Sequence, residues 1–540
     1  MSNLHGKSMR KFWRTGEPCV WFTGAALSLT LLIAATLVAV VLVNGLGVFW
    51  PSRVALLELT DGSRLIGEVM RFEERPEGAG ERLQLKIGNR DLYGLDFRWV
   101  NADEVARKSF PEEIVVLERS EHGNFYGYLR AVAAPGLDLP ADLAPLEAFG
   151  RASVAVAERQ RDIDALGARL AGLNSQLERL RLQLLKLEYR GRGGEDAAVL
   201  DIKRRRTVLK DDFEQLVARQ GLMLAEQRQI RAEFEEAGGR VKEIALAEVV
   251  RLYQPNAMSV PAKAWFYLGK LKELLFAEPR EANTEGGLFP AIFGTVILVF
   301  LMTLVTFPMG VIAAVYLREY AKEGLLVRIV RIAVNNLAGI PSIVYGIFGL
   351  GFFVYGVGGA IDQLFFPGRL PTPTFGTGGI LWASLTLALL TVPVVIVATD
   401  EALGAIPGGV REGSLALGST KFQTLMRILL PMASPGIMTG LILAMARAAG
   451  EVAPLMITGV VKLAPALPLD GTFPYLHLDR KFMHLGFHIY DIGFQSPNVE
   501  AAKPMVFVTT LLLVLIVLAM SSVAIRLRNK MKKRYTYSTF

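Results

Sequence analysis

The chain has 540 residues, of which 52% are hydrophobic and 20% are charged, and its formal net charge is +8. A charged fraction below the roughly 25% of ordinary soluble domains argues against a purely soluble protein, a disordered chain and a collagen-like chain. The charges are unevenly placed, since 75 charged residues lie in residues 51–285 and only 30 lie in residues 286–540. We therefore expect a soluble-like region and a membrane-like region in one chain.

The first apolar segment runs from Val20 to Val43 without a charge and is long enough to cross a bilayer. It follows a basic stretch, as in a secretory signal, but it is too long for the apolar part of a typical signal and predicts an uncleaved helix. We assign residues 1–19 to a basic tail and residues 20–45 to the first transmembrane helix. The single cysteine, Cys19, excludes an intramolecular disulfide bond.

Residues 46–150 have the pattern of a small β-rich module. Short runs alternate apolar and polar residues, as in Val54–Leu59 and Leu83–Ile87. Turn signals such as Asp61-Gly62 and Gly88-Asn89 separate these runs. We expect antiparallel strands joined by tight turns.

Residues 151–285 predict a helical hairpin followed by a return segment. Leucine and isoleucine recur at spacings of three and four residues, at Ile163, Leu166, Leu170, Leu173, Leu177, Leu180, Leu184 and Leu187. This is the a/d seam of a coiled coil, and the glycine-rich segment 190–194 ends it. A second, weaker seam runs from Leu209 to Phe234. We expect an antiparallel coiled coil, and the alternative is two independent helices packed on other surfaces.

Five further apolar segments predict a five-helix core in residues 286–525. They are Leu288–Leu317, Ile332–Ile361, Leu370–Thr399, Pro435–Val460 and Pro504–Ile525. Together with the first span they predict a membrane all-α fold of six transmembrane helices, which carries the β module and the hairpin as an insert. A basic tail, residues 526–540, ends the chain.

The positive charges predict the orientation in a membrane. Basic clusters flank the first and last spans, so the positive-inside rule puts both termini in the cytoplasm. Residues 46–285 then lie outside, which is the periplasm in a Gram-negative cell. The connecting segments 318–331 and 400–430 lie inside, and both are basic. We expect no nucleic acid partner, because no basic and aromatic pattern forms a groove or platform.

The sharpest motif lies in residues 400–431, between two predicted spans. Its fixed positions are Glu412, Gly413, Ser414, Gly418, Ile428, Leu430 and Pro431. The spacing resembles the cytoplasmic loop signature of ABC importer permeases, which reads E-A-A, three residues, G, nine residues, I, any residue, L-P. Gly413 and Ser414 replace the two alanines. We expect Gly418 to allow a sharp turn and Pro431 to end the element.

A short helix between two spans offers a rigid knob to a partner. The resemblance implies that this knob docks in a separate ATPase subunit and transmits the closure of that subunit to the spans. The segment is therefore the candidate ATPase-coupling loop.

Two further motifs narrow the resemblance. The first is a third-span signature at Asn336, Gly339, Pro341, Ser342 and Tyr345. The second runs from Arg447 to Pro454 and follows the pattern A-R-x-x-G-E-T-A-P, with Val452 in place of the threonine. Both resemble PstA-type permease subunits of phosphate ABC importers. The resemblance covers residues 286–540 closely and does not cover the insert.

This resemblance implies a phosphate importer subunit of the bacterial inner membrane that works by alternating access. The implied partners are a second, PstC-type permease, PstB-type ATPase subunits, a PstS-type periplasmic phosphate-binding protein and membrane lipid. The sequence has no nucleotide-binding P-loop, so ATP hydrolysis falls to the partners and the chain itself is not expected to be an enzyme. We expect no cofactor and no metal, because His484 and His488 lack a metal-site motif and fit solvated loop histidines.

Arg447 and Glu451 carry the clearest charge within a predicted span. On one helix they would lie within pairing reach, about 18 and 24 Å from a start near Pro435. A charge in the membrane is unfavourable by at least about 2.5 kcal/mol and usually marks a pathway or a partner. Arginine suits an oxyanion, so the pair is a candidate translocation element. The alternative is a structural ion pair.

Small residues recur every four positions on the same predicted helix, at Gly436, Gly440, Ala444 and Ala448. This spacing predicts close helix packing, either within the chain or between subunits.

Two other functions stay open at this point. Arginine binds many oxyanions, so a permease for molybdate or sulfate is one alternative. An envelope adaptor or sensor is the other, because a first span, a β module and a coiled-coil hairpin resemble the layout of periplasmic adaptor proteins. Such proteins need no coupling loop, which favours the transporter.

Overall fold

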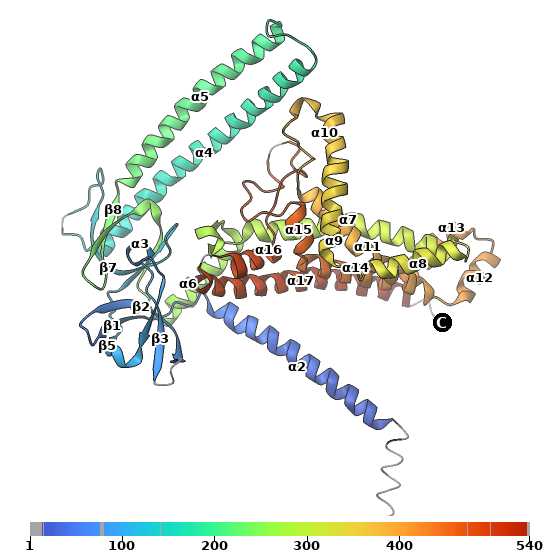
Figure 1. The fold of residues 1–540 in the computed structure, drawn as a ribbon, viewed down its shortest axis with the longest axis horizontal. Coiled ribbons are helices and arrows are strands. Elements are labelled where there is room, and N and C mark those ends of the chain that lie inside the picture. The colour runs from blue at the N-terminus through green and yellow to red at the C-terminus, as the bar shows by residue number, and fades with distance from the viewer. Residues whose placement is uncertain are drawn as a thin grey trace, which may run out of the picture.

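The computed structural model describes residues 13, 16–75, 80–140, 142–471, 473–496 and 498–536. Most of the predicted basic tail at residues 1–19 lies outside these ranges, and so do the last four residues of the predicted tail at 526–540. Figure 1 shows a bundle of helices, a β-rich part at one end of the bundle, and a pair of long helices, α4 and α5, that extends from the β-rich part.

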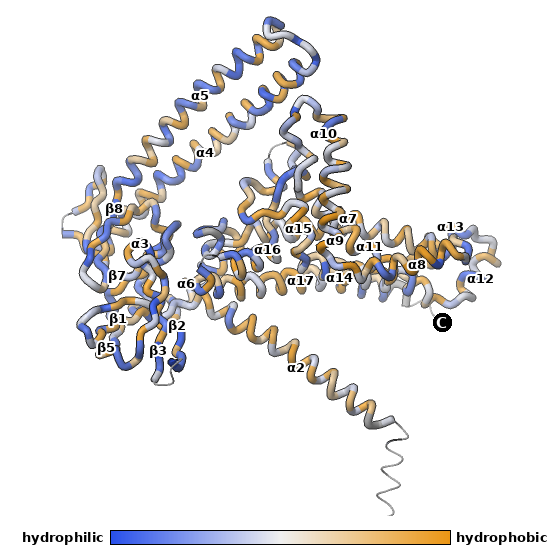
Figure 2. The backbone as a smooth tube through the Cα atoms, viewed as in Figure 1, coloured by the Kyte–Doolittle hydropathy of each residue, from blue (hydrophilic) through white to orange (hydrophobic). Residues whose placement is uncertain are grey.

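Six helices among the described residues are long and apolar enough to cross a membrane. They are Cys19–Gly47, Phe289–Tyr320, Ser342–Phe365, Ile380–Gly404, Lys421–Gly450 and Val499–Lys533. Figure 2 shows that hydrophobic residues dominate these helices, most evenly along α2 (Glu17–Gly47). The prediction of a membrane protein with six apolar helices is therefore confirmed, and the structure has two five-stranded sheets where the sequence predicts one small β-rich module.

The third apolar helix begins about ten residues later than the sequence predicts. Residues 325–337 form a separate helix, α8 (Leu325–Leu337), and the chain turns before α9 (Ser342–Phe348). Pro341 explains the break, because it lacks an N–H group and disfavours helical geometry in the residue before it. The third span then continues through a π-helical segment, Gly349–Gly358, into α10 (Gly359–Phe365).

The fifth apolar helix begins earlier and ends earlier than predicted. It runs from α13 (Lys421–Thr424) through a π-helical segment, Leu425–Leu429, into α14 (Leu430–Gly450). A short helix, α15 (Ala453–Thr458), follows. The hydropathy pattern alone could not place these ends, since apolar residues continue past Gly450.

The centre of the bundle is α11 (Ile380–Gly404), the most buried of the six apolar helices. It packs against α7 (Phe289–Val315) and against α14. A Cβ atom added at Gly436 or Gly440 would lie 2.5 Å from the Cβ of Ala402 or Ala398 on α11. The predicted seam of small residues therefore closes an interface within the chain.

Two helices complete the bundle. The last helix, α17 (Val499–Thr536), contacts α14 and α2, and Leu511 on α17 lies against Gly45. Along its apolar window, α2 has 0% of its residues buried. In Figure 1 α2 meets the bundle near its insert-side end and diverges from the bundle toward its N-terminus.

The insert contains the same five-stranded topology twice. The first sheet has the order β4-β3-β2-β1-β5 and the second has β10-β6-β7-β8-β9. Renumbered within each unit, both orders are identical, and a single 3-10 turn joins the fourth strand to the fifth in each unit. The first unit comprises β1 (Val54–Leu59), β2 (Arg64–Glu74), β3 (Glu81–Lys86), β4 (Phe97–Asn101) and β5 (Val105–Ser109). The second comprises β6 (Val115–Arg119), β7 (Phe125–Ala133), β8 (Arg231–Glu235), β9 (Val241–Ala245) and β10 (Val249–Tyr253).

The long helical pair is inserted into the second unit, between β7 and β8. It consists of α4 (Pro145–Tyr189) and α5 (Ala197–Arg228), which run side by side in opposite directions (Figure 1). At the base of α4, Phe149 packs with Phe125 and Phe234 in the core of the second β-unit. Strand β7 lies before the helical pair and β8 lies after it, and the two strands pair with each other. The β structure therefore continues beyond residue 150, where the sequence predicts the end of the β-rich module. The predicted second seam also runs too far, since α5 ends at Arg228 and Phe234 belongs to β8.

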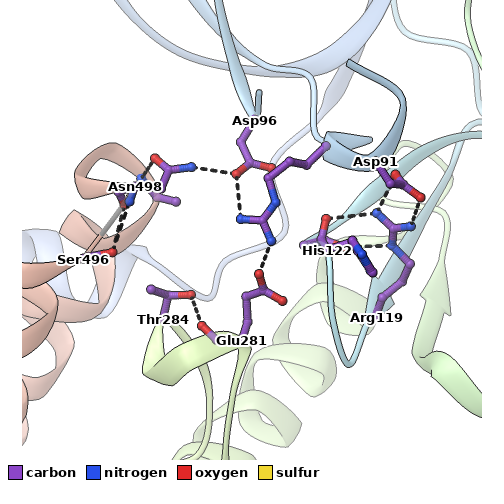
Figure 3. Close-up of polar contacts among 11 residues, drawn as sticks. Asp91, Asp96, Arg119, His122, Glu281, Thr284, Ser496 and Asn498 are labelled. Atoms are coloured by element: carbon purple, nitrogen blue, oxygen red, sulfur yellow. Dashed lines mark hydrogen bonds and ion pairs between the residues drawn. The ribbon is translucent and has the colours of Figure 1, made fainter. Parts of the chain in front are cut away.

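Two of the contacts between the insert and the bundle lie far apart. Near the start of α17, Asn498 donates to Asp96 at 2.6 Å, Arg90 lies 3.6 Å from the same carboxylate, and Arg90 also bonds Glu281 (Figure 3). At the far end of α4, the backbone near Leu185 lies against Gly368, which follows α10. The insert is thus joined to the core both at its base and at the end of the hairpin.

The seam between α14 and α11 yields a stability prediction. Gly440→Ala should lower the free energy of unfolding by about 1–3 kcal/mol, because the new methyl group overlaps Ala398. The matched control is Gly413→Ala on another helix, where nothing lies within 4 Å of the added Cβ and helix propensity rises. Thermal unfolding of the purified chain in detergent measures both. Equal stability of Gly440→Ala and the unmodified chain would contradict the close packing.

Candidate functional site

The predicted coupling segment forms a short helix, α12 (Gly408–Ala416), at the end of the bundle opposite the insert (Figure 1). Glu412 and Gly413 are exposed on it, whereas Ser414 is buried and shares a hydrogen bond of 2.8 Å with Thr424. This bond ties α12 to the start of the next helix.

Gly418 ends the coupling helix through its backbone geometry. Its φ of +86° lies in the left-handed region, and its N–H donates to the carbonyl of Leu415 at 2.9 Å. A residue with a side chain would be strained there, so the glycine of the motif has a clear physical role.

The second half of the motif starts the next span. Thr420 caps α13 in a capping box with Gln423, and the helix continues through Ile428, Leu430 and Pro431. The prediction that Pro431 ends the element is wrong. The π-helical segment 425–429 stands directly before it, and this widened turn accommodates a proline that has no N–H to donate.

Arg411, which the sequence analysis did not single out, holds the coupling helix to two spans. Its guanidinium donates to Glu319 at 2.9 and 3.1 Å, to the carbonyl of Leu403 at 2.7 Å and to the carbonyl of Ile406 at 2.8 Å. Glu319 lies in the π-helical segment Tyr316–Tyr320 that continues α7, and Leu403 lies at the end of α11. A displacement of α12 is therefore passed directly to both helices.

Apolar side chains lie exposed around this turn. Leu417 is 89% exposed and Phe422 is 63% exposed, with Leu415 and Met426 beside them in the sequence. Exposed apolar side chains grouped in this way mark a protein contact. These exposed side chains could enter an apolar groove on another chain.

The structure brings the other two motifs together deeper in the bundle. A Cβ atom at Gly346 on α9 would lie 2.8 Å from the Cα of Pro454 on α15, so the third-span signature packs on the end of the Arg447–Pro454 motif. Tyr345 is buried, and its hydroxyl donates to the carbonyl of Leu337 at 2.8 Å.

Arg447 and Glu451 form the predicted pair, but their placement differs from the prediction. The Nε of Arg447 lies 3.5 Å from Oε1 of Glu451, with 33% and 19% of the two side chains exposed. Arg447 occupies the last turn of α14, whereas Glu451 lies beyond the helix with extended backbone at ψ 137°. The pair therefore marks the insert-side end of the helix, about 39 Å from Lys421 at 1.5 Å per residue.

The remaining signature residues shape the turn between α8 and α9. The N–H of Gly339 donates to the carbonyl of Asn336 at 3.0 Å, just past the end of α8. Pro341 then precedes α9, and Ser342 is its first residue. Together they set the direction in which the third span leaves α8.

The two histidines considered for a metal site are buried, so the expectation of solvated loop histidines is wrong. His484 is the N-cap of the short helix α16 (Leu485–Tyr490) and His488 lies within it, and His484 accepts a hydrogen bond from the N–H of Gly486 at 3.1 Å. Burial lowers the pKa of His484 to about 3 and that of His488 to about 4. Among the described residues no cluster of three or more His, Cys, Asp or Glu side chains could hold a metal ion.

The chain is similar to membrane permease proteins of transport systems. A family model described as binding-protein-dependent transport system inner membrane component matches residues 306–533. The chain is 34% identical over 221 residues to the probable phosphate transport system permease protein PstA of Methanocaldococcus jannaschii, covering 40% of this chain and 67% of that protein. It is 32% identical over 224 residues to the probable ABC transporter permease protein YqgI of Bacillus subtilis, covering 40% of this chain and 70% of that protein.

A solved structure of the MetNI methionine ABC transporter in an inward-facing conformation is 21% identical, with a TM-score of 0.34, and covers 51% of this chain and 99% of that chain. The residues that the family model matches, 306–533, include α12 and the Arg447–Pro454 motif and exclude the insert.

Proposed function

The chain belongs to the family of binding-protein-dependent transport system inner membrane components, as a PstA-type permease of the ABC class, and on this basis we propose that it forms the membrane path of an ATP-driven phosphate importer. The observation that carries the proposal is the coupling helix. It presents an exposed apolar end, and Arg411 fixes it to α7 and α11. ATP-driven movement of a partner at α12 would thereby reach the helices of the path.

The proposed assembly contains four kinds of partner. A second, PstC-type permease completes the path, PstB-type ATPase subunits bind α12, and a PstS-type binding protein delivers phosphate from outside. Membrane lipid surrounds the spans. ATP is hydrolysed by the ATPase subunits, and this chain transmits the resulting movement to the path, which opens alternately to either side.

The proposed location is the bacterial inner membrane, with both termini in the cytoplasm and the insert in the periplasm. The basic residues at the end of α17 and the basic connection beside α12 support this orientation. The proposed organisation is a tail at 1–19, a first span at 20–45, an insert at 46–285 in which the helical hairpin extends from the second β-unit, a core at 286–525 with the coupling loop at 400–431, and a tail at 526–540.

Uptake of labelled phosphate at low concentration tests the proposal. Cells that lack the gene should lose high-affinity uptake, and expression of the chain should restore it. Unchanged phosphate uptake, together with lost uptake of labelled molybdate or sulfate, would contradict phosphate as the cargo and identify the oxyanion instead.

The exposed apolar end of the coupling segment gives a second prediction. Leu417→Asp should reduce uptake roughly tenfold or more, because a charge would enter the proposed groove of the ATPase subunit. The stability of the chain should change by less than about 0.5 kcal/mol, since Leu417 is 89% exposed. Leu222→Asp, at an exposed leucine of α5, is the control for the added charge. Normal uptake by the Leu417 variant would refute docking at this end.

Arg447 gives a third prediction, which separates a pathway role from a structural ion pair. Arg447→Gln should lower uptake roughly tenfold while the subunits still assemble, because a charged contact to the anion is lost. The charge-swapped variant, Arg447→Glu with Glu451→Arg, should remain equally impaired. Recovery of uptake in the swapped variant would show that the pair acts only through its mutual attraction.

A further inference from the structure

A cavity lies where the insert meets two of the apolar helices. It has a volume of about 470 Å³, which is within the range of roughly 300–1,000 Å³ typical of small-ligand sites. Its walls are the insert-side ends of α2 and α17, strands β2 and β3, and α6 (Val260–Phe276). The matched family region does not include α2, the β-units or α6, so this cavity belongs to the part of the chain that is particular to it.

The position of the cavity corresponds to the depth of lipid headgroups. The apolar stretch of α2 ends at Gly47 and is followed by Trp50, and aromatic residues of this kind gather at membrane–water interfaces. The hydroxyl of Tyr267 on α6 donates to the carbonyl of Leu46 at 3.0 Å, which fixes α6 beside the end of this span. Because α2 is unburied along its apolar window, lipid has free access to this side of the cavity.

The outer surface of α6 gives an independent indication of the same depth. Trp265, Leu268 and Phe276 are exposed at helical spacing, and Trp265 is 79% exposed. The opposite side of the helix carries Lys270 and Glu273, which pair with residues of the insert. A helix with one apolar, tryptophan-bearing face and one charged face is typical of the membrane interface.

The charges inside the cavity balance one another. Four cationic and four anionic side chains line it. Most are already paired: Lys270 donates to Glu118 at 2.7 Å, and Tyr126 donates to Glu68 at 2.8 Å. A balanced lining of this kind gives no net attraction for a free anion such as inorganic phosphate.

Two charged groups in the lining are available to a ligand. The side chains of Glu285 and Lys86 form no hydrogen bond or ion pair with other described residues, although the charges of Lys86, Lys270, Arg280 and Glu118 act on Glu285. Burial raises the pKa of Glu285, which reflects a carboxylate withdrawn from water without a hydrogen-bond donor. A ligand that brings one ammonium group and one phosphate group would satisfy both side chains.

We infer that this cavity binds the headgroup of a phospholipid that carries a phosphate and a primary ammonium, as in phosphatidylethanolamine. Glu285 accepts hydrogen bonds from the ammonium group, and Lys86 donates to the phosphate. The acyl chains leave the cavity along the unburied side of α2, where Val43 lines the wall. The bound lipid would join the insert to the two spans that flank it.

Native mass spectrometry of the full chain with added lipids tests this inference. Phosphatidylethanolamine should be retained roughly tenfold more strongly than phosphatidylglycerol, which lacks the ammonium group, and than phosphatidylcholine, whose ammonium cannot donate hydrogen bonds. Glu285→Gln should abolish this preference, and Lys86→Gln should weaken retention of all three lipids. Glu113→Gln, at an exposed position outside the cavity, is the control.

Equal retention of the three lipids by the unmodified chain would overturn the inference. Displacement of the lipid by millimolar inorganic phosphate would also overturn it, because it would identify a free anion as the ligand. Thermal unfolding of each variant checks its folding, and Lys86→Gln alone decides the question if Glu285→Gln does not fold. None of these outcomes depends on which anion the transporter carries.

Discussion

Close contact between α11 and its two neighbours is the constraint on which the rest of the structure depends. Helices in lipid gain little from burying apolar surface, so they associate where small residues let their backbones approach. Gly310 on α7 and Gly440 on α14 provide that approach on either side of α11, opposite Val395 and Ala398. Both functional regions are held by these three helices. The coupling helix is fixed at one end by Arg411, and Arg447 closes the last turn of α14 at the other.

This arrangement explains why motifs far apart in the sequence act on one unit. Arg411 bonds both Glu319, just past α7, and Leu403 at the end of α11, so the coupling helix has little freedom to move alone. At the opposite end, the third-span signature reaches the Arg447–Pro454 motif through the contact of Gly346 with Pro454. The third span thus packs against α15, which directly follows α14 in the chain. Together these contacts favour movement of the core as a body over movement of single side chains.

The sequence was sufficient to predict how many helices could span a membrane, because a run of twenty or more apolar residues is typical of a transmembrane helix. It was insufficient for their ends, which depend on how Pro341 and Pro431 are accommodated. The turn at Gly418 was also predictable, since the motif that contains it is local. The contacts of Arg411 with Glu319 and of Gly346 with Pro454 were not, because they join residues about one hundred positions apart. The duplication of the β-unit could not be predicted for the same reason, because its strands are short and the helical hairpin separates β7 from β8 in the sequence.

That separation sets the order in which the insert can fold. In the first unit only residues 75–80 lie between the second and third strands, whereas the same two strands of the second unit enclose residues 134–230. For a flexible chain, the longer loop adds about 2–3 kcal/mol to the entropy lost on closure. The two-helix hairpin reduces this penalty, because its antiparallel arms bring Ala133 and Arg231 together once they pair. During synthesis the first unit can therefore close on its own, while the second must wait for the hairpin, which acts as the template for its assembly.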